Sequence, residues 1–179
     1  GIVEEEELGA EGRRIKRKST ARSSLENVMT LLSGMGYRTQ DYDLHINFPG
    51  GTPVDGPSAG VAMAVVAASA LTGRPVDGHV AVTGEVSVRG LVKPVGGVPG
   101  KVEAAERAGL STVLIPQDNR MERFEHTTIE VCPIATLEEA LTRMLLPASA
   151  QAPADSAAVP AQAPVPVLAA EEQTAAGNG

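Results

Sequence analysis

The sequence YDLHINFPGGTPVDGPSAG, residues 42–60, joins two contrasting patterns through a loop. Apolar and polar side chains alternate over residues 42–48, which predicts a half-buried strand. Residues 49–56 contain two prolines and three glycines, which predicts a loop. Small and aliphatic residues then fill positions 57–71 on nearly every side, so a buried helix is expected there. This order of elements places Ser58 where the loop turns into the helix.

The rest of the chain shows further helical and strand patterns. Helices are expected over residues 25–34, 99–108 and 136–146, and strands over residues 2–7, 79–88, 112–115 and 128–134. Thr136 and Glu139 have the spacing of a capping box. The pattern predicts one α+β domain over residues 1–146, with mixed small sheets and packed helices. Residues 147–179 are rich in Ala and Pro without periodicity, which predicts a disordered tail.

Composition excludes several classes of function. Aromatic residues make up 2% of the chain and the net charge is −7, so neither base stacking nor phosphate tracking by this domain is expected. The basic run at residues 13–18 is interpreted as a solvated segment that faces a neighbour. Cys132 is the single cysteine and is expected to be a small core residue. No stretch has the length of a membrane span. Because the chain begins at Gly1 without a Met or signal peptide, we interpret it as a processed or excised C-terminal piece.

Ser58 carries the first candidate chemistry. A helix N-terminus has unpaired main-chain N–H groups and a dipole that favours negative charge. A serine at this point can be activated as a nucleophile, and the N–H groups can stabilise the oxyanion of a tetrahedral intermediate. The neighbouring glycine and alanine would let a substrate backbone approach closely. A serine that only caps the helix fits the same sequence equally well. Ser58 is therefore either a nucleophile or a cap.

A nucleophilic serine needs a base, and Lys101 is the best candidate. The three histidines, His45, His79 and His126, lack a pairing signature and are interpreted as structural. Lys101 is expected in the first turn of a helix, where the dipole disfavours a cation. That repulsion and burial would lower the pKa of the lysine, so that its neutral form could accept a proton. The alternative is a solvated lysine beside Glu103.

Two motif matches are incomplete. Residues 56–60 fit G-x-S-x-G, the nucleophile elbow of α/β-hydrolases, and Asp118 and His126 could complete a triad. That elbow needs a strand running directly into the serine, whereas a loop precedes it here. Residues 96–101 approach a P-loop, but the spacing is one residue short and Val102 replaces the hydroxyl residue. A nucleotide site is excluded, and an esterase of the α/β-hydrolase type stays as an alternative.

Three segments together resemble the proteolytic domain of Lon proteases. Residues 48–60 resemble the nucleophile segment, residues 82–90 and 93–97 the segment between serine and lysine, and residues 101–105 the lysine helix. The separation of 43 residues between the serine and the lysine is also similar to that of the family. The resemblance extends over about residues 1–146.

The resemblance implies a role for four residues. Ser58 would be the nucleophile and Lys101 the general base of a Ser–Lys dyad. Thr83 would form a hydrogen bond near the lysine, and Asp55 would lie in a mobile loop that gates the serine. Many Lon proteases have lysine where this chain has Val54, and the opening residues resemble bacterial, B-type-like members.

The resemblance also implies a serine endopeptidase that forms the proteolytic part of an ATP-dependent, cytoplasmic protease. An AAA+ ATPase module would precede the domain in the parent chain and would bind the ATP, while the domain itself would hold no cofactor or metal. The parent would assemble as a homo-hexamer and degrade unfolded, peptide or regulatory substrates, away from any membrane. The competing functions are a non-catalytic interaction module, in which the serine only caps a helix, and the esterase.

Overall fold

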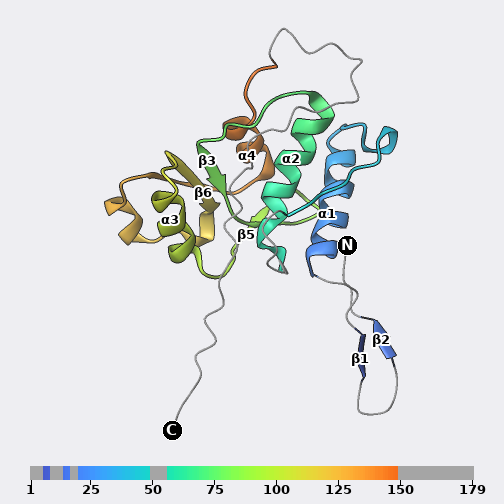
Figure 1. Cartoon of the computed structure of the whole chain (residues 1–179), viewed down its shortest axis with the longest axis horizontal. Coiled ribbons are helices and arrows are strands. Elements are labelled where there is room, and N and C mark those ends of the chain that lie inside the picture. Colours follow the sequence, from blue (N-terminus) through green and yellow to red (C-terminus); the bar gives the residue numbers. More distant parts are fainter. Residues whose placement is uncertain (1–5, 9–13, 17–19, 49–55, 149–179) are drawn as a thin grey trace.

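The computed structural model describes residues 6–8, 14–16, 20–48 and 56–148. These residues form small sheets and packed helices, which confirms the predicted α+β class (Figure 1). Asp55 and residues 149–179 lie outside the described residues, so the predicted tail stays a prediction.

A three-stranded parallel sheet is the centre of the domain. Its strands are β3 (Val80–Val82), β6 (Thr112–Pro116) and β7 (Glu130–Ile134), in the order β3-β6-β7. Apolar residues point to both faces of this sheet, as expected for a sheet that is covered on both sides. The helix α3 (Val98–Arg107) covers one face, and α2 (Gly60–Thr72) and α4 (Leu137–Met144) cover the other (Figure 1).

Each face of the sheet has its own apolar core. On the α3 side, Ala81 and Val113 pack with Val98, Val102 and Ala105 of the helix. The larger core on the opposite side joins side chains of the sheet to α2, α4 and α1 (Thr20–Gly34). Its fully buried members include Leu32, Val61, Val65, Leu114, Ile134, Leu137 and Met144.

The predicted buried helix is present, but its first turn differs. Residues 57–59 form a 3-10 helix, η2 (Pro57–Ala59), and the α-helix proper begins at Gly60. It ends before Gly73, which adopts the left-handed conformation with φ of 66°. α2 is buried almost all round, and α1 packs along it and ends at Gly34 as predicted. The last helix begins after its predicted cap: Thr136 Oγ1 accepts from the main-chain N–H of Glu139.

The prediction of a strand over residues 42–48 is wrong. These residues join no sheet among the described residues, although burial alternates over residues 44–48; Tyr42, which the pattern places on the buried side, is exposed. Leu44, Ile46 and Phe48 pack on the larger core, whereas the side chains between them are exposed. Alternation predicted which side chains face the core, but a strand also needs a neighbouring backbone.

The strand expected over residues 79–88, for which the sequence also indicates a bulge or bend at residues 83–85, is divided into two strands of different sheets. The chain leaves the parallel sheet after Val82 and forms a separate antiparallel pair, β4 (Glu85–Val86) with β5 (Val92–Lys93). Gly84, with φ of 156°, makes the break. A side chain at Gly84 would meet Val92 and Val61, because an ideal Cβ there lies 2.8 and 3.0 Å from their methyl carbons.

The remaining elements are short. β1 (Glu6–Leu8) pairs antiparallel with β2 (Arg14–Lys16), so part of the basic run at residues 13–18 is a strand. Residues 2–5 of the strand predicted at residues 2–7 lie outside the described residues. Besides η2, the described residues form three more 3-10 helices: η1 (Thr39–Asp41), η3 (Gln117–Asn119) and η4 (Glu122–His126).

Candidate active site

Ser58 lies at the middle of η2, directly before α2. Its main-chain carbonyl accepts two hydrogen bonds from the chain that leaves β3. Gly84 N–H donates over 2.9 Å, and Thr83 Oγ1 donates over 3.3 Å. A third bond, from the N–H of Val61 to the carbonyl of Gly84 at 3.1 Å, completes the link. The serine turn is therefore fixed to the end of the central sheet by main-chain bonds.

Gly60 lets the serine turn approach its neighbours closely. An ideal Cβ at this position would lie 2.9 Å from Ser24 Oγ on α1 and 3.0 Å from the main-chain nitrogen of Val86 on β4. A methyl group at this position would force Ser24 Oγ to move and would press on the backbone of β4. Close packing therefore favours glycine at residue 60.

Lys101 is buried in the first turn of α3. The helix begins after Gly97, which is left-handed with φ of 66°, and the N–H of Lys101 donates to the carbonyl of Gly97 over 3.2 Å. The side chain is 3% exposed. Among the described residues, no carboxylate forms an ion pair with it. Burial therefore lowers the pKa of Lys101 below the usual lysine value.

Thr83 connects the lysine to the serine turn. It follows β3 directly, is 1% exposed, and its hydroxyl accepts a hydrogen bond from Lys101 Nζ over 3.1 Å. The same hydroxyl donates to the carbonyl of Ser58. Ser58, Thr83 and Lys101, which the sequence singled out, thus lie together at the carboxyl end of β3. The carboxyl ends of parallel strands are where such sheets bind ligands.

The Ser58 hydroxyl and the Lys101 ammonium are not hydrogen-bonded to each other in this structure. Among the described residues, Ser58 Oγ has no hydrogen-bond partner, and Lys101 Nζ bonds Thr83 alone. Asp55, the fourth predicted site residue, lies outside the described residues. The structure therefore joins Lys101 through Thr83 to the main-chain carbonyl of Ser58, not to its hydroxyl.

The interpretation of Ser58 as a helix cap is wrong. The N-cap of α2 is Ala59 and that of η2 is Gly56, and neither helix has a side-chain cap bond. The first N–H groups of α2 are also occupied: Gly60 donates to Pro57 and Val61 donates to Gly84. An oxyanion could not bind to these two amides without displacing the bonds that shape the turn.

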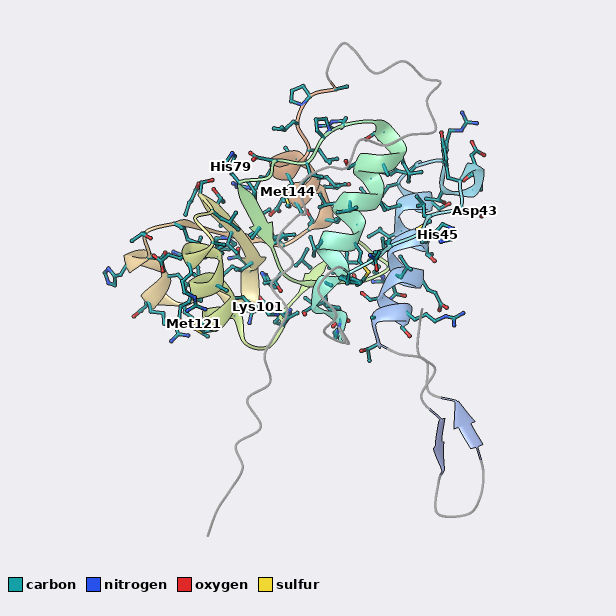
Figure 2. The ribbon with its side chains drawn as sticks, in the orientation of Figure 1. Asp43, His45, His79, Lys101, Met121 and Met144 are labelled. Atoms are coloured by element: carbon teal, nitrogen blue, oxygen red, sulfur yellow. The ribbon has the colours of Figure 1, made fainter. Side chains whose placement is uncertain are left out.

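The histidines do not join this network. His45, His79 and His126 are all exposed. Figure 2 shows Lys101 at the beginning of α3, well apart from His45 and His79. His126 lies in η4, and no hydrogen bond connects it to Ser58 among the described residues. A hydrolase triad through His126 has no support in this arrangement.

Sequence reasoning missed the part that Gly84 plays. The sequence indicates a bulge or bend at Gly84, but not that its N–H donates to the carbonyl of Ser58 and its carbonyl accepts from the N–H of Val61. An isolated glycine inside a strand pattern is the available signal, because it often marks a close approach of another backbone.

Two further features are absent from the described residues. No helix in this part of the chain is long and apolar enough to span a membrane. The described residues also contain no cluster of three His, Cys, Asp or Glu side chains that could hold a metal ion. Cys132 is buried as predicted, and burial and the nearby Glu130 carboxylate raise the pKa of its thiol.

Comparison with known proteins identifies the family. Residues 15–146 match the family described as the Lon protease (S16) C-terminal proteolytic domain. The chain is 48% identical over 147 residues to Lon protease 2 of Bacillus subtilis (strain 168), covering 82% of this chain and 27% of that protein. It is 45% identical over 109 residues to the Lon protease of Escherichia coli (strain K12), covering 58% of this chain and 14% of that protein.

A third relative gives the same result. The Lon protease of Halothermothrix orenii (strain H 168) is 44% identical over 118 residues, covering 64% of this chain and 15% of that protein. The chain thus spans about a quarter of the length of these relatives, or less. Since the matched family region covers most of the 179 residues, the chain belongs to the Lon protease (S16) C-terminal proteolytic domain family.

Proposed function

We propose that this domain is a serine endopeptidase in which Ser58 is the nucleophile and Lys101 the general base. One observation carries the assignment of the residues: a buried lysine without a carboxylate partner in the described residues is joined through Thr83 to the turn that holds the serine. Burial lowers the pKa of Lys101, and a lowered pKa is what a lysine needs to act as a base.

The proposed reaction uses two proton transfers in each of its two halves. Neutral Lys101 Nζ takes the proton from Ser58 Oγ while that oxygen attacks the peptide carbonyl, forming a tetrahedral intermediate. The resulting ammonium gives its proton to the departing amine, which leaves an acyl-enzyme on Ser58. Water then attacks the acyl-enzyme and gives a proton to the same lysine. The ammonium returns this proton to Ser58 Oγ as the acyl–oxygen bond breaks, which releases the carboxyl product and restores both side chains.

The proposal requires a direct contact between the two groups during the reaction. The Ser58 hydroxyl is free to change its χ1 angle between staggered rotamers, because it has no competing hydrogen bond among the described residues. Thr83 would hold the lysine in position, since its hydroxyl bonds both Lys101 Nζ and the carbonyl of Ser58.

The oxyanion would be received before α2 begins. Because the amides of Gly60 and Val61 already donate within the protein, the N–H group of Ser58 is the proposed donor. By the resemblance to Lon proteases, Asp55 is proposed to belong to the loop that controls access to the serine.

The wider setting of the domain is proposed from its relatives. The proteins it matches are called Lon proteases and are several times longer than this chain. We propose that the parent protein carries an AAA+ ATPase module before this domain, assembles as a homo-hexamer, and degrades unfolded or regulatory proteins with ATP in the cytoplasm.

Peptide hydrolysis by the full chain and by Ser58→Ala tests the nucleophile. We expect hydrolysis of a fluorogenic peptide to be abolished in Ser58→Ala. Stability should change by less than about 0.5 kcal/mol, because the hydroxyl caps no helix. Ser33→Ala is the control, since Ser33 is exposed on α1. A folded Ser58→Ala that keeps more than about a thousandth of the activity would exclude Ser58 as the nucleophile.

Covalent labelling separates the alternatives. A fluorophosphonate should label Ser58 in the endopeptidase and in an esterase, but not in a non-catalytic module. Loss of labelling in Lys101→Ala with normal labelling in His126→Ala supports the dyad. The reverse pattern supports the esterase.

A further inference from the structure

Asn119 binds the segment that leads into the lysine helix. It is the last residue of η3, which directly follows the central strand β6. Its side-chain oxygen accepts from the N–H of Val95 over 2.8 Å, and its side-chain nitrogen donates to the carbonyl of Val95 over 3.1 Å. One carboxamide therefore satisfies both main-chain groups of a residue 24 positions away, as a neighbouring strand would do.

Val95 lies directly before the two glycines that precede α3. β5 ends at Lys93, and α3 begins at Val98 after Gly96 and Gly97. Neither glycine has a side chain that could pack on the domain. The space around Gly96 is open, because an added Cβ would meet nothing within 4 Å, and Gly97 is left-handed. Two adjacent glycines give the backbone great conformational freedom. The bonds to Val95 hold the chain immediately before this flexible pair.

The position of Lys101 depends on where α3 begins. Its N–H bonds the carbonyl of Gly97, so the lysine is one helical turn from the glycine pair. Its Nζ must reach Thr83 Oγ1, which belongs to the end of the parallel sheet. Asn119 also follows a strand of that sheet. Its bonds to Val95 therefore connect the segment before α3 to the sheet that positions Thr83.

We propose that Asn119 is a positioning residue for Lys101, which sets the start of α3 so that the lysine side chain is directed to Thr83 and the serine turn. The expected effect of Asn119 on catalysis rests on the proposed function. Its expected effect on the position and ionisation of Lys101 does not. Asn119 would not touch the substrate. Its loss would let the helix start shift and give Lys101 more access to water.

Three variants of the full chain test the proposal. Asn119→Ala removes both bonds to Val95, and Asn119→Asp keeps the acceptor for its N–H but loses the donor to its carbonyl. Gln117→Ala is the control, because Gln117 is exposed on the same 3-10 helix. We expect kcat for peptide hydrolysis to fall about tenfold or more in Asn119→Ala, with little change in KM, because small misplacements of a base are costly. Asn119→Asp should be intermediate, and Gln117→Ala should equal the unmodified chain.

The ionisation of Lys101 gives a second readout that does not depend on activity. The chain has four lysines, Lys16, Lys18, Lys93 and Lys101, so NMR of lysine labelled at Cε can resolve them, with Lys101→Arg assigning the signal. We expect the pKa of Lys101 to rise in Asn119→Ala toward the usual lysine value, because the ammonium gains water. The Gln117→Ala spectrum should be unchanged.

The two readouts distinguish failure of this proposal from failure of the proposed function. If the unmodified chain hydrolyses no peptide but the Lys101 signal still moves in Asn119→Ala, the dyad is wrong and the positioning role of Asn119 stands. If a folded Asn119→Ala keeps both the rate and the Lys101 titration of the unmodified chain, the positioning role is overturned.

Discussion

Replacing Lys101 by Met should stabilise the fold while abolishing peptide hydrolysis. The side chain is 3% exposed, and its ammonium has one hydrogen bond, to Thr83, without a carboxylate partner in the described residues. Desolvation of a buried ion costs several kcal/mol, whereas one hydrogen bond to a charged group returns about 1.5–3 kcal/mol. Met has a similar length and no charge to desolvate. Thr83 keeps its bond to the carbonyl of Ser58, so no buried hydroxyl is left without a partner.

The expected gain in the free energy of unfolding is roughly 1–2 kcal/mol at neutral pH, or about 3–8 °C in Tm for a domain of this size. Its pH dependence has a definite sign. Because the pKa of Lys101 is lowered in the folded state, the unfolded chain binds more protons between that value and the usual lysine value. The stability of the unmodified chain therefore rises with pH across this window, and the advantage of Lys101→Met shrinks.

Thermal unfolding of both proteins from about pH 6 to about pH 10, followed by circular dichroism, measures this difference. Lys93→Met is the matched control, because Lys93 is exposed on β5 and its replacement should change Tm by little. A Lys101→Met protein that is less stable than the unmodified chain at neutral pH, or a stability difference that does not vary with pH, would refute the assignment of Lys101 as a buried, strained cation.

Three further predictions concern the fold and its boundary. Removal of residues 147–179 should leave peptide hydrolysis and Tm almost unchanged, because an Ala- and Pro-rich sequence without periodicity has no face to bury; a Tm lower by several degrees would show that it packs on the domain. Gly60→Ala should lower stability by about 1–3 kcal/mol in denaturant titrations, because the added methyl group would lie 3.0 Å from the Val86 nitrogen; an unchanged midpoint would contradict the packing requirement. Glu106 accepts from both the N–H and the hydroxyl of Thr128, which lowers its pKa. Its contribution to stability is present above the pKa of the unfolded state and is lost as pH falls through the lower, folded value, so Glu106→Gln should flatten the acid side of the pH–stability curve; a curve of unchanged shape would contradict this.

Helices and strands could be predicted from the sequence where the residue pattern of one segment alone determines its structure. The buried helix that became α2 was predictable because small and aliphatic residues fill all its sides, and Gly73 marked its end. The strand predicted at residues 42–48 failed because alternation reports only which side chains face the core. Whether a strand forms depends on a second backbone, which the pattern of one segment does not contain.

The candidate site was predictable as a set of residues, but not as a network. Resemblance to Lon proteases singled out Ser58, Thr83 and Lys101, which lie on three separate segments. Their connection through one threonine hydroxyl depends on how β3, η2 and α3 pack, and no spacing in the sequence contains that information. The same is true of Asn119, whose partner Val95 is 24 residues away. The cap interpretation of Ser58 failed because the 3-10 turn moved the start of α2 beyond the serine.

The pH dependence of kcat/KM for peptide hydrolysis, measured for the unmodified chain and for Lys101→Arg, tests the proposed dyad most directly. If neutral Lys101 removes the proton from Ser58, the rate should rise with pH through one ionisation that lies below the usual pKa of lysine. Lys101→Arg keeps the charge but cannot lose its proton, so it should be inactive at every pH. An active Lys101→Arg protein, or a rate for the unmodified chain that does not change with pH, would show that Lys101 is not the base.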